Sequence, residues 1–130
     1  PLEEELQAMQ CTQSFFKQFV SKNISLSTLP EGNDLLIVPR TLTKILEAIA
    51  YSQLSSDSLP LPLSIELAEN EIIIKFESNF SLIKSDLLID TLKVIKSQYG
   101  WLNNSLHWQD LCVFSIYIPL ERPFKVQSPV

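Results

Sequence analysis

The stretch "LSIELAENEIIIKFES", Leu63 to Ser78, contains two short apolar segments on either side of a polar turn. Alternation of apolar and polar side chains over a few residues is typical of a strand with one buried face. The pattern therefore predicts two strands, 63–68 and 71–77, joined as a hairpin. The side chains expected to share one face are Ile65, Leu67, Ile72, Ile74 and Phe76.

Helical and strand patterns alternate on both sides of this hairpin. On the N-terminal side we expect a helix over 1–22, a strand over 24–29 and a helix over 41–54. On the C-terminal side we expect a helix from Ser85 to Gly100, followed by two strands within 105–119.

Apolar residues at helical spacing identify the buried side of each expected helix. In the first helix they are Leu2, Leu6, Met9, Phe16 and Val20, and Phe15 and Phe19 widen this apolar face. The face either packs only against the core or is wide enough to contact a partner as well. In the second they are Leu42, Ile45, Leu46, Ile49 and Ala50; Thr41 is the expected cap, and Lys44, Glu47, Ala48 and Tyr51 fall on the other side. In the third they are Leu88, Leu92, Ile95 and Tyr99.

This order of elements favours an α/β (α+β) two-layer sandwich, with three helices on one face of a mixed, mostly antiparallel sheet. Residues 1–120 then form one domain, and 121–130, which contains two prolines, forms a loose tail.

The composition excludes several classes of function. The net charge is -5 and the pI is about 4.8, so nucleic acid is not an expected partner. No apolar run approaches the roughly 20 residues of a membrane span, and the acidic residues 1–10 do not resemble a signal peptide, so we expect no membrane contact by this segment itself.

Two counts restrict the chemistry further. The chain contains only two glycines, which excludes the glycine-rich loops that cradle phosphates. It contains one histidine, His107, which we expect to be structural beside Trp108; a functional role is the alternative, and no metal site is expected. Cys11 and Cys112 are expected to be buried thiols of a reducing compartment, with a disulfide as the alternative.

Several strings resemble the ATP-binding domain of sensor histidine kinases, in particular the LytS-type (autolysin-sensor) branch of the GHKL ATPase superfamily. "LSTLPEGNDLLIVPRTLTKILEAIA" is similar to the stretch that ends in the family's N-box, and "LLIDTLKVIKSQYG" to its third helix. "LPLSIELAENEIIIKFESNF" and "DLCVFSIYIPLE" look like the hairpin between them and the closing strand. The resemblance covers the chain up to about Glu121.

The resemblance implies a nucleotide site, and the chain departs from it at three places. In the N-box, Glu47 matches the family's acid, but Ala48 stands where an asparagine holds Mg²⁺, and Tyr51 and Gln53 replace basic and amide residues. In the lid, "SDLLID" lacks the glycines and has Asp90 in place of an asparagine. The family's adenine-binding motif is not present: the chain has "FESNF", which includes Asn79, at the corresponding place.

We therefore expect a degenerate domain that no longer uses ATP or Mg²⁺. It would act in signal transduction through protein contacts, with a sensor dimer or a response regulator, as the cytoplasmic part of a membrane-anchored bacterial sensor. Two alternatives remain: an active ATP-binding kinase domain whose atypical site is rebuilt from Glu47, Gln53, Asn79 and Asp90, or a small-ligand module that reuses the cleft.

Overall fold

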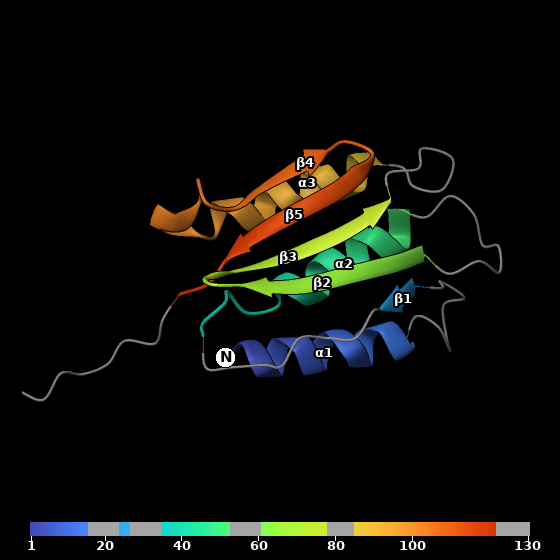
Figure 1. Cartoon of the computed structure of the whole chain (residues 1–130), viewed down its shortest axis with the longest axis horizontal. Coiled ribbons are helices and arrows are strands. Elements are labelled where there is room, and N and C mark those ends of the chain that lie inside the picture. The colour runs from blue at the N-terminus through green and yellow to red at the C-terminus, as the bar shows by residue number, and fades with distance from the viewer. Residues whose placement is uncertain (16–23, 27–34, 53–60, 78–84, 122–130) are drawn as a thin grey trace, which may run out of the picture.

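The computed structural model describes residues 1–15, 24–26, 35–52, 61–77 and 85–121 (Figure 1). Its elements follow the predicted order. They are α1 (Leu2–Phe15), β1 (Ile24–Leu26), α2 (Thr41–Ser52), β2 (Leu61–Ala68), β3 (Glu71–Glu77), α3 (Ser85–Ser97), the short 3₁₀ helix η2 (Gly100–Leu102), β4 (His107–Asp110) and β5 (Val113–Pro119).

The strands form one sheet in the order β1-β2-β3-β5-β4. β1 runs parallel to β2, whereas the β2–β3, β3–β5 and β5–β4 pairs are antiparallel. A parallel pair needs a crossover connection, and the segment between β1 and β2 contains α2. The predicted mixed, mostly antiparallel sheet is confirmed.

The register of the predicted hairpin explains its buried face. Ile65 is paired with Ile74, and Leu67 is paired with Ile72. Because directly paired residues lie on the same face, the apolar residues of both strands meet on the helix side. β5 continues this face through Ile116 and Ile118.

The three helices pack with this face in one apolar core. Figure 1 shows α2 and α3 behind the sheet and α1 beside α2 and β1. The described part of the chain is therefore a two-layer α+β arrangement. None of its helices is long and apolar enough to cross a bilayer.

α2 is the central helix of this layer, since it packs against both α1 and α3. Nine of its twelve residues are buried. The predicted exposure of Ala48 is wrong: it is 5% exposed. The prediction assumed that one side of the helix is buried against one neighbour. Because α2 is covered by α1, α3 and the sheet, residues outside the predicted stripe are buried as well.

The expected core of α1 and α3 is largely confirmed. Leu2, Leu6 and Met9 are buried, as are all four positions predicted for the third helix. That helix was expected to end at Gly100, but α3 ends at Ser97, so Tyr99 follows it. The prediction that Phe15 widens the buried face of α1 is wrong, because this side chain is 52% exposed. Phe15 lies six residues after Met9, so it points away from the buried stripe. The other apolar positions predicted for the first helix, and its expected end at residue 22, lie outside the described residues.

Two predictions about the chain's periphery need correction. Both cysteines are free and exposed rather than buried: Cys11 lies on the outer side of α1, and Cys112 lies in the β4–β5 turn. Glu121, expected to begin a loose tail, exchanges backbone hydrogen bonds with Leu36 at N–O distances of 2.7 and 2.9 Å. Residues 122–130 lie outside the described part.

Candidate functional site

The candidate site lies between the end of α2 and the start of α3. The two helices are neighbours, and the Thr41 hydroxyl at the start of α2 lies 2.9 Å from the Tyr99 hydroxyl just after α3. The helices are therefore antiparallel, as Figure 1 shows. This orientation brings the segment from Glu47 to Tyr51 to the same end of the helix layer as Asp86 and Asp90.

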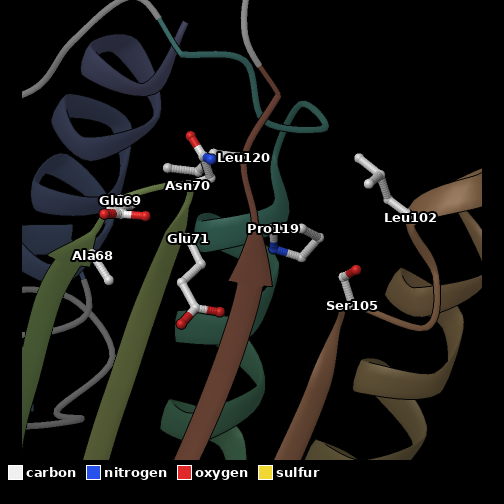
Figure 2. A pocket seen from close by; sticks show the side chains of 8 residues that line it. All are labelled: Ala68, Glu69, Asn70, Glu71, Leu102, Ser105, Pro119 and Leu120. Atoms are coloured by element: carbon white, nitrogen blue, oxygen red, sulfur yellow. The ribbon is translucent and has the colours of Figure 1, made fainter.

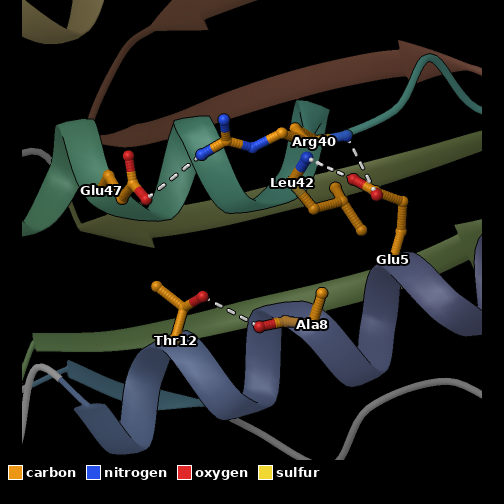
Figure 3. Close-up of polar contacts among 6 residues, drawn as sticks. All are labelled: Glu5, Ala8, Thr12, Arg40, Leu42 and Glu47. Atoms are coloured by element: carbon orange, nitrogen blue, oxygen red, sulfur yellow. Dashed lines mark hydrogen bonds and ion pairs between the residues drawn. The ribbon is translucent and has the colours of Figure 1, made fainter.

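Glu47, the acid that matches the N-box, is half-buried on α2. One of its carboxylate oxygens lies 4.0 Å from Nη2 of Arg40, at the start of the same helix (Figure 3). The two side chains are 38% and 67% exposed. An ion pair this long and this open to water contributes less than about 1 kcal/mol to stability.

Ala48 presents only a methyl group at a buried position. Its backbone carbonyl accepts a hydrogen bond from the buried hydroxyl of Ser52, with an oxygen–oxygen distance of 2.6 Å. The polar groups of this turn are therefore satisfied within the helix.

The other candidate residues do not converge on one point. Tyr51 is 56% exposed, and Leu87, which stands in place of a lid glycine, is 47% exposed. Neither side chain fills a closed cleft, and Asp90 is exposed on α3. Gln53 and Asn79 lie outside the described residues.

No metal-binding cluster appears in the described ranges, where no group of three or more His, Cys, Asp or Glu side chains could hold an ion. His107 is exposed, with Nδ1 3.0 Å from the Ser105 carbonyl oxygen. Its ring stacks on its cross-strand partner Tyr117, with a centroid separation of 4.5 Å. Both contacts hold the ring of His107 against its own strand pair, β4 and β5.

The start of α2 carries a polar junction that the sequence did not reveal. The carboxylate of Glu5, on α1, accepts hydrogen bonds from the backbone N–H groups of Arg40 at 3.0 Å and Leu42 at 3.3 Å (Figure 3). Glu5 therefore satisfies amides at the N-terminus of α2, where a negative charge also complements the helix dipole. The predicted cap, Thr41, instead donates its hydroxyl proton to the Val38 carbonyl.

Tyr99 completes the junction from α3. Because the single hydroxyl proton of Thr41 goes to Val38, the Tyr99 hydroxyl donates to Thr41. Burial disfavours the charged phenolate and raises the pKa of Tyr99 to about 12. The sequence does not single out Glu5, because it stands with Glu3 and Glu4 in the acidic first turn of α1, where each carboxylate also suits the dipole of its own helix.

A pocket of about 510 Å³ lies elsewhere, at the β2–β3 turn (Figure 2). Glu69 and Asn70 of the turn line it on one side of the end of β5, and Leu102 and Ser105, from the segment between α3 and β4, line it on the other. A second pocket, of about 370 Å³, is lined by residues of β2, β3 and β5, among them Lys75 and Phe76. Neither pocket is lined by a described residue of the candidate site.

A scan against protein-family models finds no match, and a search of the curated proteins finds none either. The likeness to the kinase ATPase domain therefore rests on the order of elements and on the quoted strings.

Proposed function

We propose that this chain is a degenerate histidine-kinase-type ATPase domain that works in signal transduction through protein contacts, without binding ATP. The order of elements supports this proposal, because it is the order that the resemblance implies. So does the arrangement of helices on one face of a mixed sheet, with the candidate site between two adjacent helices.

The observation that carries the proposal is the environment of Ala48. Mg²⁺ requires oxygen ligands in a near-octahedral arrangement, whereas this position offers a buried methyl group. Glu47, its neighbour, is directed toward Arg40. The described residues of the site therefore do not fit a magnesium triphosphate.

The start of α3 supports the same conclusion. A helix N-terminus attracts anions when it is free of negative side chains. Here Asp86 lies in the first turn and Asp90 one turn later, both exposed. Two carboxylates at this position repel a triphosphate.

In this proposal the domain is catalytically silent, and it transmits a signal by packing on a dimeric sensor or on a response regulator. Its place is the cytoplasmic side of a membrane-anchored bacterial sensor. The contact surface of the domain then carries the function that the nucleotide site carries in an active kinase.

The test is a thermal-shift and calorimetric titration with ATP and a non-hydrolysable analogue, each with and without Mg²⁺. A ligand at 100 times its Kd, bound only by the folded state, adds about 2.7 kcal/mol to the free energy of unfolding. We expect no saturable shift at millimolar nucleotide. Saturable Mg²⁺-dependent binding near micromolar would overturn the proposal.

The same titration addresses the active-kinase alternative. If Glu47 takes part in an atypical site, Glu47→Ala abolishes the shift, whereas Glu69→Ala, at the exposed β2–β3 turn, leaves it unchanged. In our proposal neither variant changes the response, because there is none. Stabilisation by a small ligand other than nucleotide, lost in Tyr51→Ala, would instead favour the small-ligand module.

A further inference from the structure

The outer face of α3 exposes two large apolar side chains. Leu87 is 47% exposed and Val94 is 58% exposed. They are seven residues apart, so on an α-helix they point in nearly the same direction, about 20° apart. Leu88, Leu92 and Ile95, on the buried side of the helix, lie about 80° to 160° around the axis from this pair.

Three charged side chains flank this apolar pair. Asp86, Asp90 and Lys93 are exposed and, at 100° per residue, lie on one side of the line from Leu87 to Val94. Arg40–Glu47 and Glu66–Lys75 form ion pairs elsewhere in the described part of the chain. Neither uses the charges of this flank.

We propose that a second copy of this chain docks on this surface, with the two α3 helices antiparallel about a two-fold axis. An isologous contact requires a surface that is complementary to itself. One register meets this requirement for the apolar pair: Leu87 of each copy lies opposite Val94 of the other.

The charges fit the same register without further adjustment. The axis then passes midway between positions 87 and 94, so Lys93 is level with the partner's position 88. That position lies between the partner's Asp86 and the partner's Asp90. The two-fold axis of an antiparallel pair is perpendicular to both helices, so the charged flanks of the two copies lie on the same side of the contact. Each Lys93 therefore faces two carboxylates of the partner.

The parallel arrangement lacks this charge pairing. Parallel α3 helices are related by a two-fold axis along the helices, which places the two charged flanks on opposite sides of the contact. Lys93 then has no carboxylate of the partner's flank opposite it, so only the antiparallel arrangement gains the attraction. The α3 surface therefore favours an antiparallel second copy, and this inference does not depend on whether the chain binds nucleotide.

The contact is small. α3 has 13 residues and is therefore about 20 Å long. One helix pair buries less than the roughly 1,200 Å² typical of a stable complex, so the dimer is expected to be weak, with a Kd on the order of 100 µM. Sedimentation equilibrium of the whole chain over a wide concentration range measures this association.

A charge exchange tests the register. Lys93→Glu should weaken self-association at least tenfold, because it places a glutamate between two aspartates. The double variant Asp86→Lys/Asp90→Lys should weaken it similarly. Mixing the two variants restores opposite charges on both sides of the axis, so the mixture should form a heterodimer about as tight as the wild-type dimer. Glu69→Lys, at the exposed β2–β3 turn, is the charge-matched control and should leave the association unchanged.

A substitution in the apolar pair tests the same surface. Val94→Glu should abolish the dimer, and circular dichroism shows whether each variant is folded. A monomeric wild type at millimolar concentration would overturn the proposal and leave the face to a different protein. A dimer unaffected by Val94→Glu, or folded charge variants that fail to associate when mixed, would place the contact elsewhere and overturn it as well.

Discussion

The hydroxyl groups of Thr41 and Tyr99 lie 2.9 Å apart in a buried hydrogen bond that joins the start of α2 to the segment after α3. Residue 99 is 58 positions away along the chain. Together with Glu5, this bond brings all three helices to one junction. The junction is a structural counterpart to the candidate site at the other end of the same two helices.

Tyr99→Phe should lower the free energy of unfolding at pH 7 by about 1 kcal/mol. The substitution removes one buried hydrogen bond but leaves the Thr41 hydroxyl its bond to Val38. Urea denaturation measures the change. Tyr117→Phe, on a half-buried tyrosine of the sheet, is the control and should cost less.

The stability of the wild type should fall between pH 10 and pH 12 in a way that Tyr99→Phe does not share. The pKa of Tyr99 is raised from 10.0 to about 12 by burial in the folded state. Below pH 10 the phenol is protonated in both states and its contribution is fully present. Between the two values the unfolded state ionises first, so up to about 2–3 kcal/mol is lost as pH rises. The prediction would be contradicted if the free energy of unfolding of the wild type and that of Tyr99→Phe changed equally with pH across this range.

Glu5→Ala should destabilise the protein by about 1 kcal/mol, because it leaves two backbone N–H groups at the start of α2 without their carboxylate. Glu4→Ala is the matched control, since Glu4 is exposed in the same turn of α1. Thermal unfolding of both variants isolates the cap. Equal losses would mean that the carboxylate acts only through the dipole of its own helix.

Arg40→Gly should be more stable than Arg40→Ala by about 1 kcal/mol. Arg40 has a φ of 67°, a left-handed conformation that glycine adopts without steric cost. Both variants remove the long ion pair with Glu47, so their difference reports the backbone alone. Denaturant titration of the two variants gives this difference, and equal stability would show that position 40 carries no strain.

Ala48→Asn introduces the amide found at the family's metal-binding position, yet it should not create a nucleotide site. The position is 5% exposed, so the larger polar side chain should cost about 2 kcal/mol. Ala8→Asn, on the exposed side of α1, should cost less than about 1 kcal/mol. Thermal unfolding with and without Mg-ATP tests both parts, and nucleotide stabilisation of Ala48→Asn would contradict the second.

The elements that could be predicted from the sequence are those set by local patterns. Alternation around Asn70 fixed both strands of the hairpin, and helical spacing placed Leu88, Leu92 and Ile95 in the core. What could not be predicted depends on neighbours distant in the sequence. Ala48 is buried because α2 is flanked on two sides, and Glu5 caps a helix that begins 36 residues later.

The candidate site was predicted only as a set of positions. The sequence aligned Glu47, Ala48 and Asp90 with a nucleotide site, but it could not show that Ala48 is buried or that the Glu47 carboxylate lies 4.0 Å from Arg40. Such pairings depend on side-chain directions that a linear motif does not contain.

The exposure of both cysteines has a practical consequence for every measurement of assembly. An accessible thiol is oxidised in air, and a disulfide between two molecules would produce a covalent species with the mass of a dimer. Experiments on α3 therefore require a reductant or the variant Cys11→Ser/Cys112→Ser, which removes every thiol in the chain. Returned one at a time, the same thiols become single attachment points for a fluorophore or spin label, on α1 or in the β4–β5 turn.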